Sequence, residues 1–397
     1  MISENLSHCT GCGACKQACP VNCIQLSENL DGFKYPIIDH SRCIKCQKCD
    51  RVCPIDKDFI STSKPKAYAC VSKDKKQLMR ETSGGVFGAI ANYVLDNKGV
   101  VYGCAFDRKL IAKHIRVDRV EDLHLLFGSK YVQSDTGQSF FEAQKDLLNG
   151  RLVLFSGTPC QIAGLVSFLG KEYENLITLD IICHGVPSQL SFTKYIKWLS
   201  KKQNGKIVEY SFRDKKVNGW SYSGYYTVKT DKKIFQKTFH YFDHYYYYYF
   251  LKGIISRDSC YTCNYSNMNR TSDFTIGDWW GAEGLNLSFN IENGCSVVLV
   301  NSMKAAEIFN HLSLNYKEVS IIDTLKYHEH LKSPSNRPQL RRSIMDDLMN
   351  KSADEIQNDF LRGNYKSIII GRIKYMVPKK VKTILQRLRY NNKRRLF

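Results

Sequence analysis

The sequence predicts an α/β protein with α+β elements in three parts: a small cysteine-rich domain, a larger domain of alternating strands and helices, and a helical, basic C-terminal region. Three observations lead to this prediction. A cysteine motif occurs twice before residue 54, and apolar β-branched runs alternate with segments of helical spacing after residue 64. Residues 364–397 carry eleven Lys or Arg and no acidic residue. We expect the domains at 1–60, 64–301 and 302–397.

Length and composition indicate a globular chain of two or three domains, since 43% of its 397 residues are hydrophobic and 24% are charged. The first residues show neither the basic nor the apolar region of a secretory signal, and no apolar run is long enough to span a bilayer. We therefore expect a cytoplasmic protein. Thiols stay reduced there, so its sixteen cysteines are better interpreted as metal ligands than as disulfides.

The N-terminal motif has the spacing of bacterial ferredoxins that hold two [4Fe–4S] clusters. It consists of Cys9, Cys12, Cys15 and Cys19 before Pro20, and recurs as Cys43, Cys46, Cys49 and Cys53 before Pro54. In such a motif the fourth cysteine of each copy binds the cluster of the other copy. One cluster is therefore predicted at Cys9, Cys12, Cys15 and Cys53, and the other at Cys43, Cys46, Cys49 and Cys19. Zinc uses four ligands in separated pairs, which eight interlocked cysteines do not match. Cys23 lies outside the pattern and is interpreted as a buried thiol.

The elements follow in order along the chain. Two short strands at 24–26 and 34–38 flank a turn at Asp31-Gly32, and a polar linker with one proline lies at 61–65. Buried strands are expected at 67–71, 100–106, 151–155, 177–182 and 297–300, and helices at 86–95, 138–148, 161–169 and 190–199. Residues 206–240 alternate polar and apolar side chains, which favours an antiparallel insertion. Residues 303–362 are expected to be mainly helical.

Three segments of the larger domain have the composition of anion-binding turns. Ser83-Gly84-Gly85 precedes an expected helix, Ser129-Lys130-Tyr131 supplies a cation and hydroxyls, and Gly157-Thr158 leads from a strand into a helix. Each has an ordinary structural alternative. No dinucleotide or P-loop fingerprint accompanies them.

Four further cysteines lie near the ends of elements of the larger domain: Cys160, Cys183, Cys260 and Cys263. Together they form a candidate third [4Fe–4S] site. The alternative is two buried cysteines plus a small zinc or redox CxxC pair. Cys70, Cys104 and Cys295 occur in apolar strands and are interpreted as small buried hydrophobes.

A series of motifs makes the larger domain recognisable over about residues 64–301. In order they are Ser83-Gly84-Gly85-Val86-Phe87, Gly103-Cys104-Ala105-Phe106, Gly128-Ser129-Lys130-Tyr131-Val132-Gln133-Ser134, Gly157-Thr158-Pro159-Cys160-Gln161, Cys183-His184-Gly185-Val186-Pro187-Ser188, Cys260-x2-Cys263 and Ser272-Asp273-Phe274-Thr275-Ile276-Gly277-Asp278-Trp279-Trp280-Gly281. Together they resemble the coenzyme F420 hydrogenase/dehydrogenase beta-subunit family, in the form with an N-terminal two-cluster ferredoxin domain. Residues 302–397 contribute no matching motif.

The resemblance implies an FAD-dependent oxidoreductase with a mixed α/β flavin-binding domain and a third cluster beside the flavin. It places Ser83, Gly84 and Gly85 at the flavin phosphates, and Ser129, Lys130, Tyr131, Gly157 and Thr158 around the ring and ribityl chain. The third cluster would take Cys160, Cys183, Cys260 and Cys263. His184 and Lys130 are the candidate catalytic residues, with a structural histidine and a surface lysine as the alternatives. A flavin of this kind couples two-electron chemistry to one-electron carriers.

Two features lie outside the motifs. Tyr245–Tyr249 are five consecutive tyrosines that circle a helix, so we expect some to pack and others to meet solvent or a partner. Segments 368–373 and 381–388 mix apolar and basic residues at helical spacing, which favours an amphipathic helix on the inner face of an anionic membrane. A solvated or partner-binding helix is the alternative. Nucleic acid is disfavoured, because no nucleic-acid-binding fold accompanies the charge.

The functional prediction is an oxidoreductase that passes electrons from a low-potential carrier such as reduced ferredoxin, through the clusters and FAD, to a small organic substrate. Coenzyme F420 and a surface-polysaccharide or sugar intermediate are the candidate substrates. The rival prediction is a non-catalytic electron-transfer subunit of a hydrogenase or dehydrogenase complex. A third, a ferredoxin fused to a nucleic-acid-binding domain, predicts salt-dependent affinity for DNA or RNA and no flavin.

Overall fold

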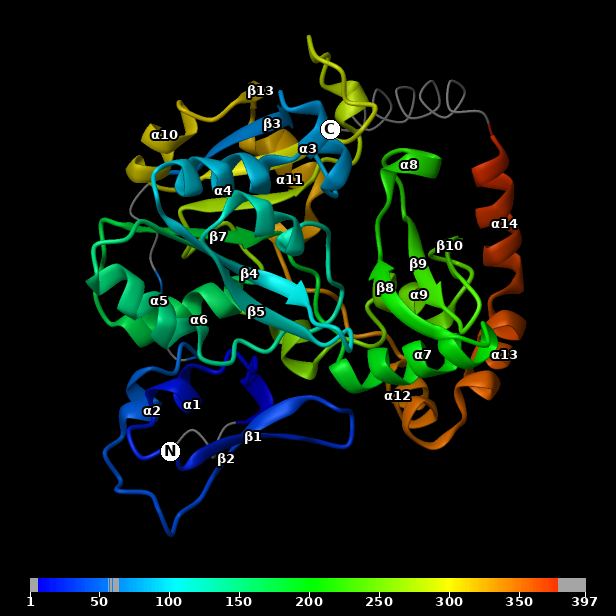
Figure 1. The fold of residues 1–397 in the computed structure, drawn as a ribbon, viewed down its shortest axis with the longest axis horizontal. Coiled ribbons are helices and arrows are strands. Elements are labelled where there is room, and N and C mark those ends of the chain that lie inside the picture. Colours follow the sequence, from blue (N-terminus) through cyan, green and yellow to red (C-terminus); the bar gives the residue numbers. More distant parts are fainter. Residues whose placement is uncertain (1–5, 56, 58, 60–63, 378–397) are drawn as a thin grey trace.

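The computed structural model describes residues 6–55, 57, 59 and 64–377. The N-terminal domain lies against one end of the larger domain (Figure 1). Its elements are η1 (Leu6–His8), α1 (Ala14–Ala18), β1 (Ile24–Glu28), β2 (Lys34–Ile38) and α2 (Lys48–Arg51). β1 and β2 pair antiparallel around the Asp31-Gly32 turn, as predicted. Gly13 precedes α1 with φ 83°, and a Cβ there would lie 2.6 Å from Thr136 Oγ1. Only glycine lets this loop approach the larger domain so closely.

The larger domain is built on an eight-stranded sheet in the order β13-β3-β12-β11-β7-β6-β4-β5. Its strands are β3 (Lys66–Ser72), β4 (Val100–Phe106), β5 (Ala112–Val117), β6 (Val153–Gly157), β7 (Leu176–Ile181), β11 (Phe274–Asp278), β12 (Ser296–Val300) and β13 (Leu314–Val319). The pairs β4–β6, β6–β7 and β7–β11 are parallel, and the remaining pairs are antiparallel. The predicted mixed α/β fold is therefore confirmed. β5, β11 and β13 were not expected from the sequence.

Helices cover both faces of this sheet. They are α3 (Lys75–Arg80), α4 (Val86–Asp96), η2 (Val120–Leu126), α5 (Ser139–Leu148), α6 (Pro159–Leu169) and α10 (Met303–Phe309). Val101 of β4 packs with α4 and α10 on one face, while its neighbours Val100 and Tyr102 pack with α5 and α6 on the other. This alternation follows from the two-residue period of a strand, and it explains why the buried strands are apolar on both sides.

A second sheet stands beside the first one (Figure 1). It contains β8 (Lys206–Ser211), β9 (Ser223–Lys229) and β10 (Ile234–His240), all antiparallel, which confirms the predicted insertion. Helices α7 (Gln189–Lys202), α8 (Lys215–Asn218) and α9 (Tyr245–Leu251) accompany it. α9 carries the five tyrosines, and all of them are buried, with exposed fractions between 0 and 7%. The expectation that some meet solvent was wrong, because aromatic side chains of α7, β10, α13 and the segment after β8 pack against the helix.

The C-terminal part is mainly helical, as predicted, apart from β13. It comprises α11 (Ile321–Tyr327), η5 (Glu329–Leu331), α12 (Arg341–Asn350), α13 (Ala353–Gly363) and α14 (Tyr365–Met376). Two short 3-10 helices, η3 (Asp258–Thr262) and η4 (Ala282–Gly284), precede β12 in the larger domain. β13 pairs with β3, so the central sheet continues beyond the boundary expected at residue 301. Ile369, Ile370 and Ile373 of α14 are exposed. No described helix has the length and hydropathy that crossing a bilayer requires. The amphipathic segment predicted at 381–388 lies outside the described residues.

Candidate functional site

The first predicted thiol set lies where the N-terminal domain meets the larger one. Burial raises the pKa of the Cys12 thiol to about 12, and the fields of Cys9, Cys160 and Cys53 add to this rise. Burial, followed by the fields of Cys12, Cys9 and Cys53, also raises the pKa of Cys15. Like charges affect each other in this way only at short range. The four cysteines predicted for one cluster therefore lie in one neighbourhood.

The second predicted set lies in the small apolar core of the N-terminal domain. Cys19, Cys43 and Cys49 pack in one small apolar cluster, and Cys46 lies partly buried on the loop between the last two. Cys23 belongs to the same cluster, with its Sγ 3.4 Å from that of Cys19. The thiol outside the motif is thus buried, as expected, and it is a direct neighbour of a predicted ligand.

The third set is assembled by tertiary structure. Cys160 begins α6, Cys183 follows β7, and Cys260 and Cys263 lie in and just after η3. Burial raises the pKa of the Cys160 thiol to about 11 and that of Cys260 to about 12, with the field of Cys263 contributing to both. Burial also raises the pKa of Cys183, on which Cys260, Cys160 and Cys263 all act. The structure therefore brings together all four cysteines that the sequence proposed for a third cluster.

The donor sets differ from a site for a single ion. Within the ranges that the structure describes, no three His, Cys, Asp or Glu side chains converge as they do around one metal ion. In an iron–sulfur cube each thiolate binds a different iron, so its four sulfurs stand farther apart than four ligands of one zinc. Groups of four buried or partly buried thiols in one neighbourhood fit such a cube.

The first and third sets are neighbours across the domain junction. The field of Cys160 acts on the thiol of Cys12. A Cβ placed on Gly164 of α6 would lie 2.9 Å from the Sγ of Cys12, so the helix passes directly over that thiol. Tyr265 stands in the fields of Cys160, Cys12, Cys263 and Cys53, and its hydroxyl donates to the Pro54 carbonyl at 3.0 Å. The two sets therefore meet around one tyrosine.

The turn of Ser83, Gly84 and Gly85 is packed tightly against β3 and β12. The Gly84 N–H donates to Ser296 Oγ at 2.9 Å, and a Cβ on Gly84 would lie 2.2 Å from the Cys70 carbonyl oxygen. Ser83 Oγ donates to the Cys295 carbonyl at 2.9 Å. These groups are engaged by the chain itself, so their predicted contact with flavin phosphates stays a prediction.

A buried carboxylate lies at the N-terminus of the helix that follows. Glu81 Oε2 accepts the N–H of Gly88 at 3.0 Å, and Gln77 donates to Oε1 at 2.8 Å. Burial raises the pKa of Glu81 to about 7. The sequence predicts that a phosphate group binds at this helix N-terminus. In the structure the Glu81 side chain takes that position.

Lys130 and the residues before it form a compact turn. Its Nζ donates to the carbonyls of Leu125, Leu126 and Phe127 at 3.3, 3.0 and 2.8 Å. Burial lowers the pKa of Lys130 to about 8. The Ser129 N–H donates to Thr82 Oγ1 at 3.0 Å, which ties this turn to the glycine turn. The ammonium group caps η2 in this structure, and a catalytic role for it stays a prediction.

Gly157 and Thr158 connect β6 with α6. Thr158 is the N-cap and forms a capping box with Gln161, and Pro159 takes the first helical position, as expected. Thr158 Oγ1 also lies 3.2 Å from the Sγ of Cys160. The predicted flavin-side turn and the third thiol set therefore share one helix N-terminus.

Tyr131 and His184 are linked by a third ring, that of Phe250. The centroids of Tyr131 and Phe250 are 4.4 Å apart at 24°, and those of His184 and Phe250 are 4.6 Å apart. Burial, with the field of His330, lowers the pKa of His184 to about 4, so its imidazole is neutral at pH 7. Because His184 follows Cys183, these rings lead from the third thiol set to Tyr131.

Sequence reasoning missed Arg213, which lies beyond Tyr131. Its side chain is 2% exposed, and Nη1 lies 3.2 Å from the Tyr131 hydroxyl and 3.0 Å from Asp278 Oδ2. Asp278 Oδ1 accepts the Trp220 indole N–H at 2.9 Å. Trp220 in turn stacks on Trp280, with centroids 4.4 Å apart and planes 7° apart. Arg213 belongs to no motif, so only the tertiary fold reveals it.

Several buried polar atoms around Arg213 have no hydrogen-bond partner among the described residues. They are Arg213 Nε and Nη2, Tyr247 Oη, Trp279 Nε1, His328 Nε2 and His330 Nδ1. Buried polar groups in proteins are nearly always bonded. A flavin combines an aromatic ring system with polar edges, so the residues of this region fit such a group. We call Tyr131, Arg213, Phe250, Asp278 and Trp280 the aromatic–arginine site.

Comparison with known families gives two matches. Residues 8–57 match the model of the 4Fe–4S dicluster domain. Residues 150–323 match the model of the C terminus of the coenzyme F420 hydrogenase/dehydrogenase beta subunit. The chain thus carries a dicluster ferredoxin match near its N-terminus and, farther along, a match to the C terminus of the F420 hydrogenase/dehydrogenase beta subunit. The resemblance found from the motifs is confirmed.

Two individual proteins are similar to parts of this chain. A ferredoxin-like protein in the nif region of Sinorhizobium fredii (strain NBRC 101917 / NGR234) is 44% identical over 60 residues, covering 14% of this chain and 86% of that protein. The solved F420-reducing [NiFe] hydrogenase complex from Methanosarcina barkeri contains a chain that is 15% identical, with a TM-score of 0.42, covering 79% of this chain and 94% of that one.

The matched beta-subunit segment contains the third thiol set together with Gly157, Thr158 and His184. The predicted flavin-site residues from Ser83 to Tyr131 lie before the matched segment, although Tyr131 packs against Phe250 of the matched part.

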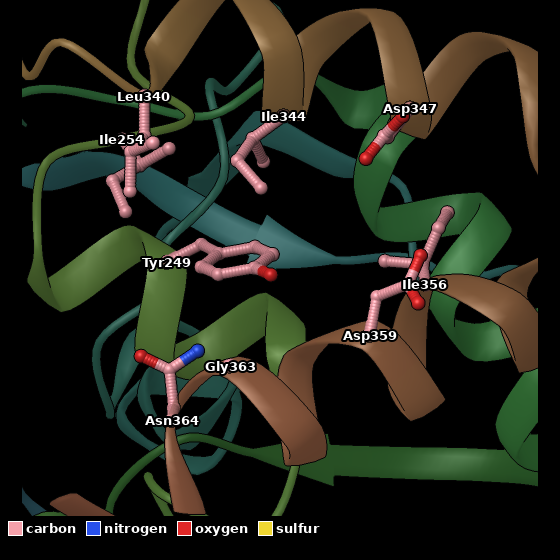
Figure 2. Close-up of a pocket in the computed structure, with 9 residues that line it drawn as sticks. All are labelled: Tyr249, Ile254, Leu340, Ile344, Asp347, Ile356, Asp359, Gly363 and Asn364. Carbon is pink, nitrogen blue, oxygen red and sulfur yellow. The ribbon is translucent and has the colours of Figure 1, made fainter.

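A separate cavity of about 200 Å³ lies among α9, α12 and α13, with the Tyr249 ring pointing into it (Figure 2). Its two carboxylates, Asp347 and Asp359, both pair with Lys351. None of the predicted site residues lines this cavity.

Proposed function

We propose that this chain is an iron–sulfur flavoprotein oxidoreductase. Electrons enter from a low-potential carrier such as reduced ferredoxin at the Cys43 set, pass through the Cys9 set and a third cluster at Cys160, Cys183, Cys260 and Cys263, and reach FAD at the aromatic–arginine site. A small organic substrate accepts them there. The observation that carries the proposal is the placement of the third thiol set between the Cys9 set and the aromatic–arginine site.

Residues of the aromatic–arginine site would have separate tasks in this reaction. Tyr131 and Phe250 supply flat aromatic surface beside His184, and Arg213 and Asp278 supply a fixed pair of opposite charges. A bound flavin supplies exchange between one-electron carriers and two-electron chemistry. Arg213, held by Asp278 and the Tyr131 hydroxyl, keeps the N–H groups of Nε and Nη2 for an electron-rich edge of a flavin or substrate. Burial of these groups keeps water from competing for them.

The test is anaerobic purification of the full chain with determination of iron, sulfide and flavin. Three cubes predict about twelve irons per chain, together with one FAD released on denaturation. Cys183→Ser should lower the iron content by about four and leave the flavin bound. Cys104→Ala, at a cysteine of β4 outside all three sets, is the matched control and should leave both contents unchanged. A wild-type preparation with about eight irons and no flavin would end the catalytic proposal.

The second candidate is an electron-transfer subunit of a larger redox complex. The exposed Ile369, Ile370 and Ile373 of α14 favour it, because they offer apolar surface to a partner. An anionic membrane is the other proposed contact of this basic segment. Co-purification with a second polypeptide, lost when these three residues are changed to Ser, supports the subunit. Oxidation of reduced ferredoxin by the chain alone, coupled to coenzyme F420 or a sugar nucleotide, supports the enzyme.

A further inference from the structure

Arg257 is a fully buried cation at the junction between the N-terminal domain and the larger domain. Its Nε donates to the Cys9 carbonyl at 2.7 Å, and its Nη2 donates to the Lys34 carbonyl at 3.0 Å. Nη1 lies 3.2 Å from Gln133 Oε1, and Gln133 itself donates to the Thr10 carbonyl at 2.9 Å. An arginine of the larger domain therefore holds the loop that begins the first thiol set.

The positive charge of Arg257 is not neutralised locally. Its guanidinium lies 4.1 Å from the centroid of the Tyr35 ring, and among the described residues no carboxylate forms an ion pair with it. The adjacent Asp258 is paired with Arg337 and Arg341 instead. A buried arginine without a carboxylate partner is unusual and needs a source of negative charge.

Thiol sets supply that negative charge on both sides of Arg257. Its guanidinium lies against the backbone of Gly11, where an added Cβ would come within 3.0 Å of Nη1. Its field also acts on the thiols of Cys160 and Cys260. A [4Fe–4S] cube with four thiolates is an anion, and one-electron reduction makes it more negative. The fixed positive charge of Arg257 beside the Cys9 loop therefore favours the reduced form of the cluster. Net charge and hydrogen bonding are among the factors that set cluster potentials.

We infer that Arg257 raises the reduction potential of the cluster bound by Cys9, Cys12, Cys15 and Cys53. The second cluster has Arg51 at its ligand loop, where Nη2 donates to the Cys46 carbonyl at 3.1 Å. Arg51 is exposed, however, so water and salt screen its charge far more than that of the buried Arg257.

Arg257 thus makes the inner cluster the better acceptor and directs electrons inward. Each transfer is one electron from an external one-electron donor, with no proton and no bond change. Only the dicluster domain and its contact with Arg257 are needed for this effect, which is therefore independent of flavin binding.

The experiment is a redox titration of the full chain, followed by electron paramagnetic resonance under anaerobic conditions with dithionite and mediators. In Arg257→Gln, reduction of one N-terminal cluster should become about tenfold less favourable, a shift of about 59 mV to more negative potential for one electron. The other N-terminal cluster should keep its potential. Arg257→Lys, which retains the charge, should keep most of the wild-type potential.

Two further variants separate charge from docking. Ser259 Oγ donates to the same Cys9 carbonyl at 3.0 Å, so Ser259→Ala removes a neutral bond to this loop and should leave the potential near the wild-type value. Gln133→Glu places a carboxylate beside Nη1 and should shift the potential in the same direction as Arg257→Gln. If Arg257→Gln loses its iron, the shift of the reduction potential in Gln133→Glu tests the role of the Arg257 charge instead. Equal shifts in Ser259→Ala and Arg257→Gln, or no shift in Gln133→Glu, would overturn the inference.

Discussion

The N-terminal domain and the central sheet hold their cysteines in opposite ways. In the N-terminal domain eight predicted ligands come from two short loops, and the apolar core around them is small. In the larger domain four cysteines are brought together from β7, α6 and η3 by a sheet whose core is complete without them. The first region is expected to depend on its clusters for folding, while the second is expected to fold first and bind afterwards.

Cluster removal gives the largest expected difference between the two regions. After oxidative destruction of the clusters and chelation of the iron, amide protons of β1 and β2 should exchange within the dead time. Those of β4, β6 and β7 should keep their protection, because apolar packing holds the sheet. Hydrogen exchange followed by mass spectrometry measures both. Equal loss of protection in the two regions would show that the comparison is wrong.

The buried ion pair of Arg270 and Asp180 gives the next largest effect. Their atoms are 2.8 Å apart, the side chains are 2% and 1% exposed, and Arg270 also donates to the Tyr265 carbonyl at 2.8 Å. Arg270→Met should lower the free energy of unfolding of the larger domain by about 3 to 5 kcal/mol, since it leaves a carboxylate buried alone. Denaturant titration checks this value. Arg342→Met, at the exposed pair with Asp346, is the control and should cost less than about 1 kcal/mol.

Glu81 predicts a pH dependence that is confined to the larger domain. Its pKa is raised by burial from 4.5 to about 7, so the folded state binds this proton more tightly than the unfolded state does. The free energy of unfolding should therefore fall between pH 4.5 and 7, by up to about 3 kcal/mol. Glu81→Gln should remove this fall. The pKa of Lys215 is lowered by burial to about 7. Lys215 therefore makes the free energy of unfolding rise with pH only above about pH 7. Denaturant melts at pH 4.5, 6 and 7 test the difference, and identical slopes in both proteins would contradict it.

The smallest effect comes from two tyrosines of the aromatic core. The Tyr195 hydroxyl forms a hydrogen bond with His244 Nδ1 at 2.8 Å. The Tyr245 hydroxyl has no hydrogen-bond partner among the described residues. Tyr195→Phe should cost about 1 kcal/mol, while Tyr245→Phe should be neutral or stabilise by a similar amount. Thermal melting of the two variants compares them directly. A larger loss for Tyr245→Phe would mean that its hydroxyl has a bonding role.

Local signals allowed the N-terminal domain to be predicted almost completely. The fixed spacing of its cysteines, the proline after each motif and the Asp31-Gly32 turn all act within a few residues. In the larger domain β3, β4, β6, β7 and β12 were predicted, because both faces of the sheet are buried and these runs are apolar. β5 and β11 were missed because charged and polar residues interrupt their apolar pattern.

The aromatic–arginine site was beyond local reasoning. Arg213 comes from the β8–β9 insertion, Asp278 from the end of β11 and Phe250 from α9, and only packing joins them. The five tyrosines show the same limit, since a helix can be apolar on all sides when several elements enclose it. Arg257 shows it too, because its partners are backbone carbonyls of a domain more than 200 residues away in the chain.

Gly164 sets the gap between α6 and the Cys12 loop by lacking a side chain. A methyl group there would lie 2.9 Å from the Cys12 sulfur, so either α6 or the N-terminal loop would have to retreat. Tunnelling of an electron weakens steeply with distance. In the proposed electron path, one added carbon at Gly164 would therefore lengthen the step from the Cys9 set to the third thiol set and slow the transfer between them.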